Sequence, residues 1–263
     1  MVVRLFEYGQ SIPSIDSTQP APARIPTRLY TRWATRIQWG MGCGLLALLG
    51  GMLITAPSLA QTDRFTVSAL QRSEACIDAL YHIQARPIET TPISSAQATE
   101  ICQQALMLTQ VAGDRRLEAY IQGNLGTLAL QQQQYAAARQ HYDRTLQLAE
   151  SIADSDLQVK ALIAIGSTET HLSQFESAIL FYQQALNLAQ AQNDAAGMAI
   201  AYYNLGLAYD QLSDPIAATA AYQQATLKAQ SIEDVMLEVL AAQKLQLAQQ
   251  RSQDSIDRQI SIR

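Results

Sequence analysis

The sequence has little charge, few residues that break regular structure and few cysteines. Charged residues are 16% of its 263 residues, against roughly 25% in an ordinary soluble domain. Residues 61–263 hold only three prolines and six glycines, and the whole chain has three cysteines. These shortages disfavour a collagen, a disulfide knot, a β-sandwich and a polytopic membrane protein. An α/β enzyme would also normally carry more glycine.

Glutamine takes the place of the missing charge. Residues 61–263 contain 30 glutamines, and long unbranched polar side chains lose little rotamer freedom in a helix. With so few breakers between them, these residues predict helices over most of the region. The composition therefore predicts an all-α fold.

The charge is distributed unevenly along the chain. Residues 1–60 carry five arginines against Glu7 and Asp16, a balance of 5 − 2 = +3, so the remainder carries 13 − 21 = −8. The few basic residues of this acidic remainder are scattered, which is not the footprint of a nucleic-acid-binding surface. We therefore expect no nucleic-acid partner.

An uncharged stretch over 37–60 follows the basic region 1–36, whose composition predicts disorder. Its most apolar part, Leu45 to Ile54, has the length of a signal-peptide core, and Ser58 and Ala60 precede a cleavage point before Gln61. The alternative is a retained membrane anchor, because the uncharged stretch is longer than the roughly 20 residues that a span needs. Both interpretations place the body of the protein outside the cytoplasm: periplasmic, lumenal or extracellular.

The body repeats itself with a 40-residue period. Several residue types recur in one register: Leu125-Gly126, Ile165-Gly166 and Leu205-Gly206; Ala138, Ala178 and Ala218; Tyr142, Tyr182 and Tyr222; and Asp114, Asp154, Asp194 and Asp234. Within each unit the apolar residues fall at helical intervals in two runs separated by a short turn. Each unit is thus predicted to be a helical hairpin, and the hairpins to stack into an α-solenoid.

The register divides the body into parts. Three full repeats cover 113–152, 153–192 and 193–231. A degenerate opening hairpin covers 61–112, with a helical run from Phe65 to Ala85, and a capping helix with a frayed tail covers 232–263. In the opening hairpin Cys102 stands one full period before Tyr142.

The full units resemble tetratricopeptide repeats, whose pattern is Leu-Gly, an aromatic, Ala, an aromatic and Ala. The first unit supplies Leu125, Gly126, Tyr135, Ala138 and Tyr142; the second Ile165, Gly166, Phe175, Ala178 and Tyr182; the third Leu205, Gly206, Ala218 and Tyr222. The family norm is about 34 residues, so these units are similar to the longer repeats of kinesin light chains and G-protein signalling modulators. Thr145 and Pro215 depart from the pattern, but proline is tolerated at the start of a helix.

Physical chemistry explains why several residue types recur at their register positions, independently of the family resemblance. Glycine inside a helix costs about 1 kcal/mol relative to alanine, so Gly126, Gly166 and Gly206 indicate close approach of a second helix. The recurring tyrosines are expected to fill the space between one hairpin and the next. The recurring aspartates precede helices, where a carboxylate accepts hydrogen bonds from free backbone N–H groups. We prefer this capping role to calcium binding, which needs several oxygen ligands close in sequence.

Two cysteines lie in the opening hairpin. Cys76 and Cys102 would stand nearly level across it, so a disulfide is geometrically feasible and would be expected in an oxidising compartment. The alternative is that Cys102 is a small buried apolar residue.

Catalytic and metal-binding patterns are scarce. His82, His141 and His171 lie on different predicted helices with no ligand at metal-binding spacing. The sequence shows no nucleophile motif and no phosphate-binding loop. We therefore expect no enzymatic activity, no metal and no cofactor.

The resemblance implies a binding groove. In tetratricopeptide proteins the first helices of successive hairpins line a concave face that holds a peptide or a partner helix. Their carboxylate clamp needs Lys, Arg and Asn on this face, at positions that here carry Gly123, Ile163, Tyr203, Thr127, Ser167 and Leu207. The clamp is therefore absent. The positions implied for partner binding are Tyr120, Thr127, Gln131, Lys160, Ser167, His171, Tyr203, Asp210 and Gln211.

The sequence thus predicts a non-catalytic protein–protein interaction scaffold outside the cytoplasm, with a tether through 37–60 if that segment is retained. The alternative is a structural component of an oligomeric or membrane-associated assembly, in which the stack packs against copies of itself. An enzyme is the third and least favoured class.

Overall fold

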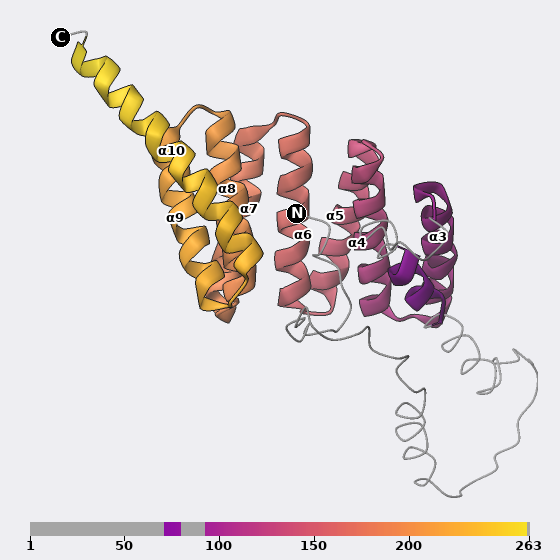
Figure 1. Cartoon of the computed structure of the whole chain (residues 1–263). Helices are drawn as coiled ribbons and strands as arrows, with labels where there is room; N and C mark the ends of the chain where they lie inside the picture. Colours follow the sequence, from indigo (N-terminus) through magenta and orange to yellow (C-terminus); the bar gives the residue numbers. More distant parts are fainter. Residues whose placement is uncertain (1–70, 80–92, 262–263) are drawn as a thin grey trace, which may run out of the picture. The chain divides into compact units, whose positions relative to one another are not determined.

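The structure is a computed structural model that describes residues 71–79 and 93–261 (Figure 1). Within those residues the regular structure is helical throughout. A helix covers 71–79, so the rest of the run expected from Phe65 to Ala85 lies outside the described residues, as do 1–60. The other helices are α3 (Ser95–Ala112), α4 (Arg115–Gln131), α5 (Tyr135–Ser151), α6 (Ser155–His171), α7 (Phe175–Gln192), α8 (Ala195–Gln211), α9 (Pro215–Ser231) and α10 (Val235–Ser261).

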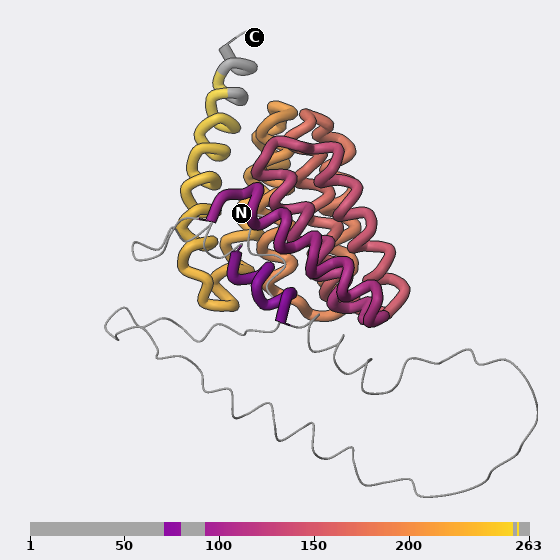
Figure 2. Tube along the Cα trace, turned by 90° about the vertical axis from the view of Figure 1, so that its right-hand side faces the viewer, coloured from indigo at the N-terminus to yellow at the C-terminus, as the bar shows by residue number. Residues whose placement is uncertain are grey.

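The helices from α4 to α9 form the three predicted hairpins. Each helix packs against the next one in the chain, and the first helices α6, α8 and α10 also pack against one another in sequence order. Figure 2 looks along the stack from the α3 side, so that the successive hairpins lie one behind another. The all-α solenoid predicted from the repeat period is confirmed.

The turns between successive helices from α3 to α10 all have one form. Each contains one residue in the left-handed region, with φ between 54° and 72°. Glycine occupies only the first of these positions, which are Gly113, Gln133, Ala153, Ser173, Asn193, Ser213 and Glu233. The predicted caps follow directly: Asp114, Asp154, Asp194 and Asp234 each accept a hydrogen bond from the backbone N–H three residues on, at 2.9–3.1 Å. The capping role is confirmed.

The helical glycines are explained by the tyrosines. A Cβ atom added to Gly126, Gly166 or Gly206 would lie 2.5–2.6 Å from Cε1 of the tyrosine on the second helix of the same hairpin. Each ring therefore lies on the glycine of its own hairpin, in addition to filling the core shared with the next. The tyrosines are at most 1% exposed, and Ala138, Ala178 and Ala218 are fully buried beside them.

Each buried tyrosine hydroxyl has a partner on the first helix of its own hairpin. Tyr142 shares a hydrogen bond with Thr127 at 3.2 Å, and Tyr182 shares one with Thr170 at 3.2 Å. Tyr222 donates to Asp210 Oδ2 at 3.0 Å. Burial raises the pKa of the Tyr142, Tyr182 and Tyr222 phenols. These phenols therefore stay neutral and act as hydrogen-bonding core residues.

The opening hairpin is held differently. Cys76 Sγ, in the helix over 71–79, is bonded to Cys102 Sγ in α3, with the Cα atoms 4.8 Å apart. Both cysteines are fully buried. Ser94 begins α3 with a capping box, in which its hydroxyl accepts from Gln97 N and the Gln97 side chain accepts from Ser94 N. The register position of the core tyrosine is thus filled here by half of a disulfide.

The last helix is longer than the sequence predicts. A frayed tail is expected after Gln250, but α10 continues to Ser261. Its 27 residues span about 40 Å at 1.5 Å per residue. Figure 1 shows its C-terminal part running past the neighbouring helices.

Candidate protein-binding surface

The predicted groove residues differ widely in accessibility. Gln131, His171 and Gln211 are exposed, and Lys160 and Asp210 are half-buried. The remaining four, Tyr120, Thr127, Ser167 and Tyr203, are at most 8% exposed. We call these nine predicted residues the binding row. Five of them are accessible, so the accessible part of the row is shorter than the sequence predicts.

The buried members of the row take part in packing. Thr127 shares its hydrogen bond with Tyr142, and the Tyr203 ring lies 5.9 Å from the Tyr222 ring, centroid to centroid. The first helices α6 and α8 each lie against their own second helix, the preceding second helix and a neighbouring first helix, so little of their circumference is left open. Burial raises the pKa of the Tyr120 and Tyr203 phenols. A binding role for these buried residues stays a prediction.

The exposed members line one edge of the stack. Gln131, His171 and Gln211 occupy the same register position in successive repeats and lie in the last turns of α4, α6 and α8. The His171 ring stacks on the ring of Tyr135 from α5, with centroids 5.5 Å apart and planes 10° apart. This stack joins the first full repeat to the second at the accessible edge.

Asp210 has a structural role in addition to its predicted one. Its Oδ2 accepts from the Tyr222 hydroxyl, and its Oδ1 accepts from Arg251 Nη1 at 2.9 Å. The carboxylate thus connects α8 to both α9 and α10. Burial and the Asp210 charge together raise the pKa of the Tyr222 phenol.

Sequence reasoning missed two asparagines in this row. Asn124 and Asn204 are 4% and 6% exposed, and their Nδ2 atoms have no hydrogen-bond acceptor among the residues that the structure describes. Asn124 stands four residues after Tyr120, three before Thr127 and seven before Gln131. Residues at such spacings share one face of a helix. Each asparagine directly precedes the Leu-Gly pair of its helix, so the sequence gives their positions in the row, although not the absence of an acceptor.

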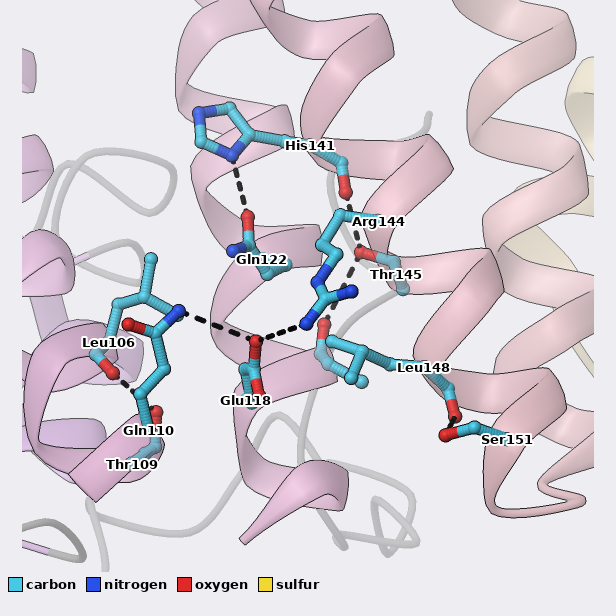
Figure 3. A network of polar contacts seen from close by, with 11 residues as sticks. Leu106, Thr109, Gln110, Glu118, Gln122, His141, Arg144, Thr145, Leu148 and Ser151 are labelled. Atoms are coloured by element: carbon cyan, nitrogen blue, oxygen red, sulfur yellow. Dashed lines mark hydrogen bonds and ion pairs between the residues drawn. The ribbon is translucent and has the colours of Figure 1, made fainter. Parts of the chain in front are cut away.

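A polar network joins α3, α4 and α5 (Figure 3). Glu118 Oε1 accepts from Gln110 Nε2 at 3.4 Å and from Arg144 Nη2 at 3.1 Å. One helical turn further along α4, Gln122 Oε1 accepts from His141 Nδ1 at 2.7 Å. Burial lowers the pKa of the His141 imidazole. The Gln110–Glu118 hydrogen bond connects the opening hairpin to the first full repeat, and the other contacts join the two helices of that repeat.

The described residues contain neither a metal-binding group of side chains nor a membrane-spanning helix. In 71–79 and 93–261, no three His, Cys, Asp or Glu side chains are grouped so that they could hold a metal ion. Over the same ranges no helix combines the length and hydropathy needed to cross a bilayer. The segment 37–60, predicted as signal or anchor, lies outside them.

A family comparison agrees with the repeat geometry. The model of the tetratricopeptide repeat matches residues 117–191 and again residues 157–226. Residues 117–226 carry tetratricopeptide repeats. The two overlapping matches run from α4 into α9. No curated protein matches the sequence.

The chain is similar to several solved structures. Aspartyl phosphate phosphatase F from Bacillus subtilis is similar with a TM-score of 0.58 and 16% identity, over 79% of this chain and 51% of that one. This chain therefore spans about half the length of that protein. BtubC from P. vanneervenii (TM-score 0.49, 19% identity, 76% and 92% covered) and MamA (0.39, 19%, 62% and 91%) are more distant. At these identities the likeness concerns the fold alone. Tetratricopeptide repeats in general form protein-interaction scaffolds.

Proposed function

We propose that this tetratricopeptide stack is a non-catalytic scaffold whose first helices hold a peptide or helix of a partner protein, outside the cytoplasm. The binding row on α4, α6 and α8 here includes Asn124 and Asn204 as well. Its exposed edge carries Gln131, His171 and Gln211.

The two unpaired asparagine amides carry this proposal. A buried donor without an acceptor costs about 1–3 kcal/mol, and Asn124 and Asn204 incur this cost at the same register position in two repeats. Both amide nitrogens are inaccessible in this conformation, so a backbone carbonyl of a partner satisfies each donor once a neighbouring side chain has moved aside. A destabilising feature that recurs in register and lies on one helix face is typical of a binding site.

The character of the row limits the kind of partner. Lys160 is paired with Asp156 at 2.9 Å, and Arg116 is paired with Asp154, so the charges on α4 and α6 are largely balanced within the protein. On α8 the neighbouring half-buried residues Ile200 and Leu207 are apolar. The row therefore favours a partner segment of mixed apolar and neutral character. A free C-terminal carboxylate is not favoured.

A matched pair of asparagine substitutions tests the proposal. Asn204→Leu removes the unpaired donor at nearly constant size, so we expect partner capture from the native host extract to fall at least tenfold while the free energy of unfolding rises by about 1 kcal/mol. Asn187→Leu makes the same chemical change at an exposed position of α7 and should leave capture unchanged. Equal capture by wild type and Asn204→Leu would refute the role of the row.

The disulfide supports a location outside the cytoplasm. Bonded cysteines persist in oxidising compartments and are rare in the cytosol, and the Cys76–Cys102 bond joins two fully buried sulfurs. We expect the unreduced protein from its native host to have an intact mass two hydrogens below that of the fully reduced chain. The mass should correspond either to a chain that begins at Gln61 or to the full-length chain with its anchor retained. A mass showing free thiols would contradict this location.

A further inference from the structure

The last helix takes the place of a first helix in the stack. Leu237, Ala241 and Ala248 of α10 are fully buried in a cluster that they share with residues of α8 and α9. The helix packs against α9 and α8, as α8 packs against α7 and α6. It therefore stands one repeat period after α8, and each of its residues up to Arg251 has a register counterpart on that helix.

One side of α10 continues the register of the binding row. It consists of Leu240, Lys244, Leu247 and Arg251, which we call the α10 face. Intervals of four, three and four positions place these residues on one side of a helix. Lys244 stands one full period after Asn204, and Arg251 stands one full period after Gln211.

An ion pair shows that the α10 face is turned towards the row on α8. Arg251 Nη1 donates to Asp210 Oδ1 at 2.9 Å, and Asp210 is a member of the binding row. Lys244 precedes Arg251 by seven positions, which is about two helical turns, so the two side chains leave α10 on the same side. The surface formed by the first helices thus extends over α4, α6, α8 and α10.

Lys244 differs from the other cations of this surface in its pairing. Lys160 pairs with Asp156 at 2.9 Å, and Arg251 pairs with Asp210. Lys244 is half-buried, and none of the carboxylates in the described part of the chain forms an ion pair with it. Carboxylates are not scarce, since residues 61–263 carry a balance of 13 − 21 = −8.

The neighbours of Lys244 on this surface are apolar. Leu240 is half-buried and Leu247 is 47% exposed, and Ile200 and Leu207 on α8 are half-buried. A partner segment that covers these side chains also removes water from the ammonium group. A charge that loses its water without gaining a partner is costly, whereas a charge-assisted hydrogen bond to a carboxylate is among the strong ones. The surface therefore favours a segment that brings a carboxylate to this position.

We propose that the binding row continues onto α10, where Lys244 binds an aspartate or glutamate side chain of the partner segment. This inference rests on the proposed function, because it assumes that a partner occupies the row. Apolar residues on either side of the acidic residue contact Leu240 and Leu247. The partner is then neutral and apolar along α4, α6 and α8 and acidic at the α10 end, which fixes the direction in which it lies along the stack.

Peptide selection tests the charge that the α10 face prefers. The probe is a displayed library of random peptides, selected on the chain purified from its host and resynthesised with amidated C-termini. Peptides whose affinity falls about tenfold or more with Asn204→Leu bind the row. We expect these peptides to carry Asp or Glu between apolar residues and to lose affinity at least about tenfold with Lys244→Glu, because like charges in an interface repel.

Two further substitutions are the controls. Lys244→Arg keeps the charge and should bind the same peptides within about threefold of the wild type. Lys228→Glu makes the same charge reversal at a half-buried lysine of α9 and should leave their affinity unchanged. A peptide whose acidic residue is replaced by lysine should lose affinity for the wild type and regain it with Lys244→Glu, which shows at the same time that this variant is folded.

The outcomes separate this inference from the proposed function. Row-binding peptides that lack an acidic residue, or that bind the wild type and Lys244→Glu equally, would overturn the inference and leave the proposed function standing. Loss of binding on amidation would also overturn it, because the carboxylate would then be the C-terminus of the peptide. If no selected peptide responds to Asn204→Leu, both the inference and the proposed function fall.

Discussion

The three full repeats and the opening hairpin solve the same packing problem with different chemistry. In each full repeat a buried tyrosine lies on a glycine of the first helix. In the opening hairpin the tyrosine's register position is Cys102, which is bonded to Cys76. The comparison teaches that the periodic middle is held by noncovalent packing that recurs in each unit. The opening hairpin, where the described part of the stack begins, is held by a covalent bond as well.

The largest expected effect comes from removing a core ring. Tyr182→Ala empties the space over Gly166 in the central repeat, and truncation of a large buried aromatic costs about 3–5 kcal/mol. We expect this loss in the free energy of unfolding measured by urea denaturation. Tyr202→Ala, at a half-buried tyrosine of α8, is the control and should cost clearly less. Equal losses would contradict a special role for the ring.

Reduction of the disulfide should have the next largest effect, and a local one. Opening a bond across 26 residues removes roughly 3 kcal/mol in the chain-entropy model. We expect hydrogen exchange to accelerate over the helix 71–79 and α3. The amides of α6 to α9 should keep their protection, and an equal loss there would show that the ends and the middle are not held separately.

The helical glycine provides the third test. Gly166→Ala places a Cβ 2.6 Å from the Tyr182 ring, and such overpacking costs about 1–3 kcal/mol against a helix-propensity gain of about 1 kcal/mol. We therefore expect a net loss of up to about 2 kcal/mol in the free energy of unfolding, measured by thermal or urea denaturation. Gln246→Ala, the same register position in α10, has no ring above it in the described structure and should be nearly neutral. A stabilised Gly166→Ala variant would refute the close contact.

The smallest effect is a pH dependence confined to the first full repeat. The His141 pKa is lowered by burial, so below its ordinary value of about 6.5 the unfolded chain binds more protons than the folded one. The stability linked to His141 is present above that pH and is lost as the pH falls towards the lowered pKa. Unfolding measured across this window should show the loss, and His141→Gln should reduce it. An unchanged pH profile in that variant would contradict the assignment.

The periodic features could be predicted from the sequence and the aperiodic ones could not. Glycines, tyrosines and aspartates in register determine the hairpins and their caps, because each depends on contacts that recur in every repeat. The repeat pattern does not decide whether Cys76 and Cys102 are bonded, because a buried free cysteine at position 102 fits the pattern equally well. The pattern also does not predict the burial of Tyr120 and Tyr203. Helix periodicity predicts which face of the helix a side chain lies on, but not how closely the neighbouring helices cover that face.

The unpaired amides of Asn124 and Asn204 could not be predicted either. Whether a buried donor finds an acceptor depends on side chains from several helices, and sequence spacing alone does not position those. Similarly, the sequence underestimates the length of α10, since no glycine or proline marks its end and the polar residues after Gln250 resemble a frayed tail.

Site-specific photo-crosslinking in the native host tests most directly whether the first helices hold a partner. A photoreactive residue placed at Gln211, in the exposed end of the row on α8, should form an adduct with a partner protein. The same residue at Gln184, exposed on α7, should not. An adduct from Gln184 with none from Gln211, or equal adducts from both, would contradict the account.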